Sequence, residues 1–482
     1  MKGSTFKRCG CRNPATGRQY GPGCPKLRRR DHGSWWARYD LPRGADGRRR
    51  QEKIGPYATR AEAEAALAEA VDGANKGTNH GVNRQTFGDY LDQWIAGKAW
   101  LSENTRTGYL THIRLYYRPG LGHVRMSDLR DHHFEELYAA MRQIGRLADG
   151  VRPSPMLRRL LEARTETQQA RRPLSASRIK RIHATATSAL NSAVRRKRIP
   201  FNPAEHIELV PPRRRRPLVW TAERIERWQQ TGRRPAPVMV WTPQQTGAFL
   251  DFVADDALYA LWHLLAYRPL RRGEVAGLPW SDVDLAAGTL LVRETNPGHV
   301  TGDEDGWDDP KSDAGERTVT LDDQTVQVLR ACKKRQSELR LALGDGWVDS
   351  GRVFTKETGE PLSPDGISQR FDRFLTRHAV IRRRHAEDGW SVERLARAHA
   401  VPERAVLTAL AAPLPPIRLH DLRHGAASLM LAAGVDINVV KEECGHATAA
   451  FTRDFYQHVF PEVAKAAAEA VAAIVPRSAL GK

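Results

Sequence analysis

Cysteine is scarce in this sequence of 482 residues, which holds five, an odd number. So few thiols do not make the disulfide framework of a small secreted domain, and they favour a reducing compartment. No run approaches the roughly 18 apolar residues of a membrane span. The first ten residues, MKGSTFKRCG, lack the apolar stretch of a secretion signal. We therefore expect a cytoplasmic protein with no membrane contact.

Acidic residues are also in deficit, with 56 Asp and Glu against 76 Lys and Arg, a formal charge of +20. Residues 1–60 alone hold 16 basic and 4 acidic residues. Basic runs such as GRRR (47–50), RRKR (195–198) and PPRRRR (211–216) lie between segments and have no apolar face. Solvated loops are the simple alternative, but repetition at several junctions favours a polyanionic nucleic acid. The candidate contacts are Arg48, Arg49, Arg50, Arg195, Arg196, Arg213 and Arg214.

The length predicts several domains. The residue patterns along the chain predict that they are mainly helical, with small β elements. GSWWARYDL and RRRQEKIG predict a hairpin, and the following TRAEAEAALAEA predicts a helix with Thr59 as N-cap and Glu62 at the capping-box position. Residues 84–205 show helical periodicity, interrupted at 145–174 by a Gly- and Pro-containing stretch that reads as a loop or insertion. A third region begins with a helix capped by Thr242 and contains two strand-like runs, 288–294 and 316–321.

The first 32 residues contain three of the five cysteines. Cys9, Cys11, Cys24 and His32 could form a structural Cys₃His zinc site. The C-x-C spacing is tighter than usual for zinc, so three free reduced thiols remain the alternative.

Six separated polar residues in the last region make chemical sense together. Guanidinium groups can fork onto phosphodiester oxygens, imidazoles can move protons, and a lysine can protonate a leaving oxygen. A phenol becomes a nucleophile when a cationic site stabilises its phenolate. No carboxylate cluster of two-metal character is evident. The six are Arg271, Lys311, His420, Arg423, His446 and Tyr456.

The surrounding motifs carry a resemblance. LRRGEVAGLPWSDVDL around Arg271, RLHDLRHGAASLMLAAGV around His420 and Arg423, and GHATAAFTRDFYQHV from His446 to Tyr456 resemble the tyrosine recombinase (phage integrase) family. The likeness is greatest to integrases of actinobacterial phages and integrative elements. It implies that the six residues are catalytic, with Tyr456 as nucleophile.

The resemblance also implies an architecture, with the residues before 33 forming a basic Cys/His segment. We expect an arm-type DNA-binding module of a three-stranded sheet and a helix at 33–80. A helical, SAM-like core-binding domain with the 145–174 insertion would follow at 84–210. A basic linker at 211–236 would lead to an α-rich catalytic domain with a small antiparallel sheet at 237–476. Within it, 385–412 is a helical insertion, either a plain hairpin or a helix-turn-helix DNA reader with Arg404 almost its only base-reading side chain.

The implied activity is DNA strand transfer through a 3′-phosphotyrosyl intermediate, without ATP or a required cofactor. It would integrate a mobile element and, with a helper, excise it. The implied partners are double-stranded attachment sites, a homotetramer on synapsed DNA, a directionality factor (excisionase) and a host DNA-bending protein, which places the protein at the nucleoid. A catalytically inactive DNA-binding protein and a type IB topoisomerase-like enzyme are the alternatives.

Further details concern neighbouring residues. Glu274 and Asp421 are expected to orient nearby arginines, and His424 to support the site from behind. The family often has Gly where this chain has Pro269, which removes an N–H close to Arg271. It prefers Leu where this chain has Cys444, a change that a small apolar thiol accommodates.

Overall fold

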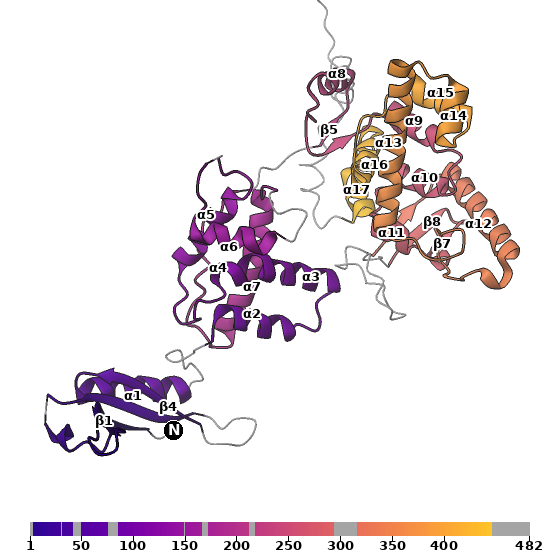
Figure 1. The fold of residues 1–482 in the computed structure, drawn as a ribbon. Coiled ribbons are helices and arrows are strands. Elements are labelled where there is room, and N and C mark those ends of the chain that lie inside the picture. Colours follow the sequence, from indigo (N-terminus) through magenta and orange to yellow (C-terminus); the bar gives the residue numbers. More distant parts are fainter. Residues whose placement is uncertain are drawn as a thin grey trace, which may run out of the picture. The chain divides into compact units, whose positions relative to one another are not determined.

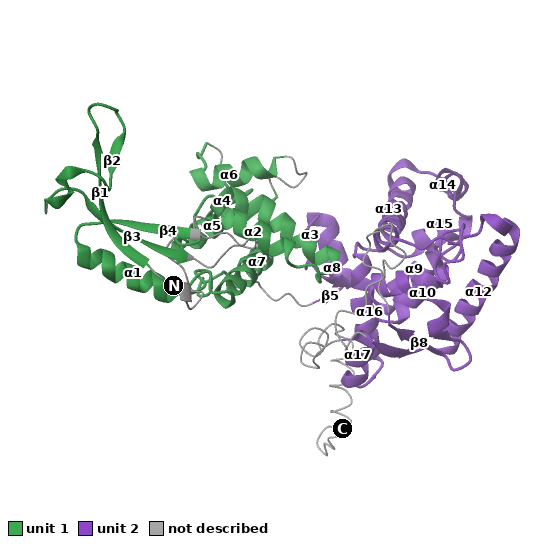
Figure 2. Cartoon of the chain, turned by 90° about the horizontal axis from the view of Figure 1, so that it is seen from below, with its two compact units in different colours: residues 1–213 green, residues 214–482 purple. Residues whose placement is uncertain are grey.

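The computed structural model describes residues 3–29, 31–41, 50–75, 85–148, 150–165, 172–211, 217–293 and 316–445. The chain divides into two compact units, residues 1–213 and 214–482 (Figures 1 and 2). Within the described residues, no helix combines the length and the apolar composition needed to cross a membrane.

A four-stranded antiparallel sheet opens the first unit, with strand order β2-β1-β3-β4. Its buried side chains in the described residues include Ala37 and Tyr39 on β3 and Ala63 on α1, the helix that follows the sheet. Cys9 and Cys24 are buried as well. The expected hairpin is confirmed by β3 and β4. The prediction of a three-stranded sheet within residues 33–80 is wrong. The described part of that range contributes β3 and β4, and the first 32 residues add β1 and β2 to the same sheet. The elements are β1 (Gly3–Arg12), β2 (Gln19–Gly21), the 3₁₀ turn η1 (Pro25–Arg28), β3 (Ser34–Leu41), β4 (Arg50–Tyr57) and α1 (Arg60–Asn75).

The helix that packs on this sheet begins as its sequence predicts. The Glu62 backbone N–H donates to Thr59 Oγ1 at 3.2 Å, and the Ala58 N–H donates to the Glu62 carboxylate at 3.1 Å. These bonds satisfy amides that the first helical turn leaves without intrahelical partners.

The rest of the first unit is a helical bundle around an aromatic core. Phe87, Tyr117 and Phe134 are fully buried, and the ring of Phe87 meets both of the others edge-on at about 6 Å. The helices are α2 (Phe87–Ala96), α3 (Glu103–His112), the π-helical turn η2 (Ile113–Tyr117), α4 (Arg118–Leu121), α5 (Asp131–Gln143), α6 (Pro155–Arg164) and α7 (Ala176–Arg195).

Helix α6 corrects the expectation of a loop at 145–174. Ser154 caps it by accepting a hydrogen bond from the Leu157 N–H, and Pro155 takes the first helical position. Its residues Met156, Leu157 and Leu160 are buried in the bundle core. The glycines and prolines of this stretch therefore mark the boundaries of a short helix.

The second unit has a core of its own, centred on Trp220, Trp241 and Trp262. The capping box of Thr242 and Gln245, with Pro243 at the first turn, confirms the predicted start of α9. The elements up to the small sheet are β5 (Leu218–Val219), α8 (Ala222–Thr231), β6 (Met239–Val240), α9 (Pro243–Phe252), α10 (Tyr259–Tyr267), α11 (Arg272–Gly277) and the 3₁₀ turn η3 (Trp280–Asp282).

The two strand-like runs of this unit pair as expected. β8 (Thr289–Val292) lies between β7 (Val283–Asp284) and β9 (Arg317–Thr320) in an antiparallel sheet. The connection between β8 and β9 is outside the described residues. The helices that follow are α12 (Asp323–Leu343), α13 (Pro364–Asp388), α14 (Val392–His399), α15 (Glu403–Ala411), α16 (Leu419–Ala432) and α17 (Ile437–Cys444).

Helices α14 and α15 form the predicted hairpin, which packs on α9 and α13. Leu395 and Val406 are fully buried in the core. The Arg404 guanidinium, the main candidate base reader, forms a salt bridge with Asp255, with Nε at 2.8 Å from the carboxylate. This arrangement favours a hairpin that completes the domain core over a DNA reader.

Candidate active site

Three of the six predicted catalytic residues lie within the described residues, and they come from two neighbouring helix starts. Arg271 is the N-cap of α11, and His420 and Arg423 lie in the first turns of α16. Lys311, His446 and Tyr456 lie outside the described residues.

Arg271 is held at the surface by two bonds. Its Nη1 donates to Glu274 Oε1 at 2.5 Å and its Nη2 to the Gly445 carbonyl oxygen at 3.1 Å. The Arg271 backbone N–H donates to the other Glu274 oxygen at 2.7 Å. The side chain remains 42% exposed, and a guanidinium has five N–H donors. Arg271 is thus oriented by the protein and still open to an incoming anion.

Glu274 is shared by several arginines. It is 5% exposed and accepts two hydrogen bonds from Arg317, at 2.8 and 3.1 Å, besides those from Arg271. Burial alone would raise its pKa, but the hydrogen bonds and charge of Arg317, with the charges of Arg271 and Arg423, lower the pKa below its usual value. Glu274 therefore stays ionised and fixes the positions of the cations around it.

Arg423 is much less accessible than Arg271, with 4% of its side chain exposed. Its Nη1 donates to the Pro269 carbonyl oxygen at 2.6 Å and its Nη2 to the Cys444 carbonyl oxygen. The proline that departs from the family pattern therefore contributes an acceptor that orients Arg423. Arg271, two residues later, is fixed by Glu274 despite the missing Pro269 N–H.

The end of α17 is bound by three arginines in succession. The carbonyl oxygens of Glu443, Cys444 and Gly445 accept hydrogen bonds from Arg317, Arg423 and Arg271, respectively. These carbonyls are at the negative end of the helix, where cations stabilise groups that lack intrahelical donors. The residue after Gly445 in the sequence is His446. The arginines thus hold the point where the chain leaves α17 toward the predicted His446 and Tyr456.

His420 is exposed, and its ring meets that of His424 edge-on at 4.8 Å. Surrounding protein atoms remove enough water to lower the His420 pKa, and the positive charge of Arg423 lowers it further. A neutral imidazole is therefore the favoured form at neutral pH. His424 lies behind it at 9% exposure.

Asp421 is buried and pairs with Arg418, which precedes α16. The Arg418 backbone N–H and guanidinium both donate to the carboxylate, the side-chain bonds reaching 2.6 Å. Asp421 thus orients an arginine as expected, but that arginine is Arg418. These bonds do not involve Arg271 or Arg423.

Arg317 is the residue that the motif analysis missed. It occupies an inward position of β9, where the alternation of buried and exposed residues would call for an apolar side chain. A charged residue at such a position signals a buried partner, here Glu274. Cys444 fits the small-hydrophobe interpretation: it is fully buried beside Val440 and Met430, and burial raises its pKa to about 11.

The predicted DNA contacts are only partly within the described residues. Arg195 and Arg196 are exposed at the C-terminal end of α7. Arg50 begins β4, whereas Arg48, Arg49, Arg213 and Arg214 lie outside the described residues. In the first unit, Cys9, Cys11, Cys24 and His32 converge on one another.

Comparisons with known proteins agree with the motifs. The sequence model of the phage integrase family matches residues 393–462, which include His420, Arg423, His446 and Tyr456. A tyrosine recombinase XerC-like protein of Caldanaerobacter subterraneus subsp. tengcongensis is 22% identical over 84% of this chain and 87% of its own length. An integrase of Streptomyces ambofaciens is 22% identical over 84% of both chains.

The fold has a counterpart among solved structures. The Tn1549 transposon integrase, in complex with transposon right end DNA, superposes with a TM-score of 0.52 at 17% identity. The match covers 80% of this chain and 99% of that one. The helix-rich architecture with small antiparallel sheets is therefore a fold that this chain shares with the Tn1549 protein.

Proposed function

We propose that the chain is a member of the phage integrase family of tyrosine recombinases, whose sequence model matches residues 393–462. In this proposal it is a site-specific integrase that cuts and rejoins DNA through a 3′-phosphotyrosyl intermediate. The observation that carries the proposal is the junction at the end of α17. There Arg271 and Arg423 bind the last carbonyl oxygens of α17, from which the sequence continues into His446, ten residues before Tyr456. The charges of the same two arginines help to keep His420 neutral.

In the first step, the Tyr456 oxygen attacks the scissile phosphorus. A bond from phosphorus to the phenolic oxygen forms, the bond to the 5′-oxygen breaks, and the phenolic proton passes to a basic group of the site. Lys311 protonates the departing 5′-oxygen. In the second step a 5′-hydroxyl of the partner duplex attacks phosphorus and its proton returns to Lys311. The bond from phosphorus to Tyr456 breaks, and the phenolic oxygen takes back its proton from the basic group. Each step exchanges one phosphoester bond for another, so neither ATP nor a cofactor is required.

The described residues have distinct tasks in this scheme. Arg271 can place its exposed guanidinium on a non-bridging oxygen and neutralise charge that develops in the transition state. Neutral His420 can donate one hydrogen bond or accept a proton. Arg423 is nearly buried, so it acts mainly by fixing α17 and by its charge.

The DNA partners follow from the same family membership and from the charge of +20. We propose that two duplex attachment sites are joined within a homotetramer, that this reaction integrates a mobile element, and that a directionality factor permits excision. A host DNA-bending protein would bring arm and core sites together. The exposed Arg195 and Arg196 are suited to phosphate contacts, which position the protein without reading bases.

The test is covalent capture. Purified protein is mixed with a nicked duplex attachment site taken from the DNA flanking its gene, and detergent-resistant protein–DNA adducts are counted. We expect an adduct with the wild type and none with Tyr456→Phe. Tyr267→Phe, at an exposed tyrosine elsewhere in the domain, should form it normally.

Neighbouring arginines give a second matched comparison. Arg271→Lys should slow adduct formation by about 10²–10³-fold, because a lysine cannot hold Glu274 and a phosphate with one planar fork. Arg272→Lys, at a residue paired with exposed Asp365, should change the rate little. If the wild type binds the site tightly yet forms no adduct, the inactive DNA-binding alternative holds. Relaxation of supercoiled DNA without strand exchange between duplexes would indicate the topoisomerase alternative.

A further inference from the structure

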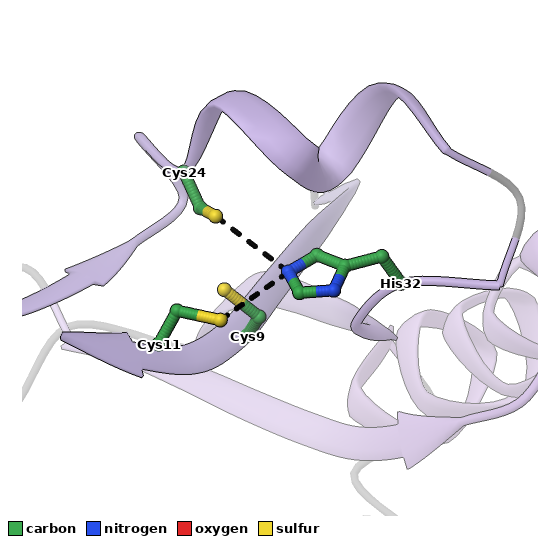
Figure 3. Close-up of side chains that lie close together, drawn as sticks. All are labelled: Cys9, Cys11, Cys24 and His32. Atoms are coloured by element: carbon green, nitrogen blue, oxygen red, sulfur yellow. Dashed lines mark hydrogen bonds between the residues drawn. The ribbon is translucent and has the colours of Figure 1, made fainter.

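The first unit contains a cluster unrelated to strand transfer. Figure 3 shows Cys9 and Cys11 on β1, Cys24 before η1 and His32 before β3, with their side chains directed toward one point. We propose that these four residues bind one structural Zn²⁺ ion. The ion would hold together residues 9–33, which we call the extension of the sheet.

The distances agree with zinc coordination. His32 Nε2 lies 3.5 Å from Cys11 Sγ and 3.6 Å from Cys24 Sγ, and all four ligand atoms lie within 4.8 Å of one another. A tetrahedral ion with bonds of about 2.3 Å to sulfur and about 2.0–2.1 Å to nitrogen separates sulfur from nitrogen by about 3.6 Å. The side chains are thus spaced as ligands of a shared ion.

Hydrogen bonding alone explains this arrangement less well. In a neutral imidazole, Nε2 either donates one hydrogen or accepts through one lone pair, so it makes one good bond. Here two sulfur atoms approach the same nitrogen at nearly equal distances. A metal ion between them gives all three atoms a partner at once.

The local backbone explains how distant residues meet. Cys9 and Cys11 are two apart on β1 and so share a face, and the pairing with β2 shifts register between Cys9 and Arg12. Gly33, directly after His32, has φ of +80°, and a Cβ there would lie 2.7 Å from the Arg8 carbonyl oxygen. Only glycine lets the chain pass β1 closely enough to bring His32 to the cysteines.

The extension has no apolar core that could replace a metal. Among the described residues from 9 to 33, only Cys9, Gly21 and Cys24 are buried. A segment this short without a core usually needs a disulfide or a metal to stay folded. Three sulfurs cannot all pair as disulfides, whereas three sulfurs and an imidazole complete one zinc site.

The donor set also identifies the ion and its role. Thiolate and imidazole ligands favour zinc over magnesium or calcium, which prefer oxygen. Four protein ligands leave no open position for water, as in structural sites. Three thiolates with Zn²⁺ carry a net charge of −1, in a segment where residues 3–29 contain seven basic and no acidic residues. The ion would therefore order a strongly basic surface formed by β1, β2 and η1.

The experiment measures metal in the full-length protein, purified with a non-thiol reductant and no chelator. We expect about one zinc per chain, bound in the four-ligand site. Cys24→Ser and Cys9→Ser should lose most of it. Cys332→Ser, at a thiol of the second unit, should keep it. His32→Cys should also keep it, because four thiolates still form a tetrahedral site, whereas His32→Ala should bind more weakly.

Cobalt gives a readout that does not depend on how well the variants fold. Replacing zinc with Co²⁺ in the wild type should produce the visible absorption of a tetrahedral thiolate site, and adding Zn²⁺ should abolish it. The proposal is overturned if the wild type holds no zinc and its three thiols react equally fast with and without added Zn²⁺. A protein mass lower by two hydrogens would instead indicate a disulfide. Covalent capture through Tyr456 is a separate measurement, so either result leaves the proposed strand transfer to its own test.

Discussion

Two arginine–carboxylate pairs in this chain have the same length and different surroundings. The atoms of Arg317 and Glu274 lie 2.8 Å apart with their side chains 6% and 5% exposed. Those of Arg272 and Asp365 also lie 2.8 Å apart, but with 47% and 70% exposed. A buried charge that loses its partner is costly, whereas an exposed one is solvated by water.

We therefore expect Arg317→Met to lower the free energy of unfolding of the second unit by about 3–5 kcal/mol, because it leaves Glu274 buried with fewer donors. Arg272→Met should cost about 0–1 kcal/mol. Urea unfolding followed by tryptophan fluorescence measures both. Equal losses in the two variants would contradict the assigned role of burial.

At the same scale, motif spacing gave the candidate site residues but not their surroundings. Arg271, His420 and Arg423 are proposed from that spacing alone. The burial of Arg423 and the pairing of Arg317 with Glu274 could not be inferred from it, since they depend on β9 and α17 lying beside α11. Only the charge at an inward strand position gave a local indication of Arg317.

At the scale of elements, two basic side chains on helices differ in their partners. Arg195 ends α7 and is exposed, whereas Arg404 on α15 is bound to Asp255. Each phosphate contact releases counterions, so losing one reduces the salt dependence of binding by about one unit of slope.

We expect Arg195→Ala to weaken binding to all duplex sequences and to reduce this slope by about 1. Arg404→Ala should leave both the slope and the affinity nearly unchanged. Fluorescence anisotropy titrations over a series of salt concentrations provide the measurement. A larger effect of Arg404 than of Arg195 would restore the interpretation of the α14–α15 hairpin as a DNA reader.

Elements with a regular apolar period were predictable, and those without one were not. α7 and α9 have clear helical periodicity or caps, and both were expected. α6 is short and flanked by Gly and Pro, so its buried face was not recognised. β1 was missed because its buried position in the extension is Cys9 and not a conventional apolar residue.

At the scale of the whole molecule, each unit has its own core and contains a buried histidine whose pKa is strongly lowered. His112 in the first unit is 6% exposed and His378 in the second is 1% exposed. Burial, reinforced by nearby arginine charges, lowers the pKa of each to about 4. Below about pH 6.5 these histidines bind a proton in the unfolded chain but remain neutral in the folded one. Protonation therefore favours the unfolded chain, and the free energy of unfolding falls as the pH is lowered from about 6.5 toward 4.

We expect calorimetry to resolve two unfolding transitions, whose midpoint temperatures both fall between pH 7 and pH 5. Between about pH 6.5 and pH 4, each histidine should lower the free energy of unfolding of its unit by up to about 3 kcal/mol. His112→Gln should weaken the pH dependence of one transition and His378→Gln that of the other. His132→Gln, at an exposed histidine, should alter neither. If either core variant shifted both transitions equally, the units would unfold as one.

The arginines at the end of α17 bear on how this sequence can change during evolution. Arg271 holds the Gly445 carbonyl and is also the proposed phosphate ligand, and Arg423 holds the Cys444 carbonyl while its charge acts on the proposed site. A substitution at either position is therefore exposed to purifying selection twice, once through chemistry and once through folding. A descendant that lost strand transfer would still be under pressure to keep both guanidiniums. Their presence in a homologous sequence is consequently weak proof of activity, and the tyrosine is the residue by which a degenerate copy would first be recognised.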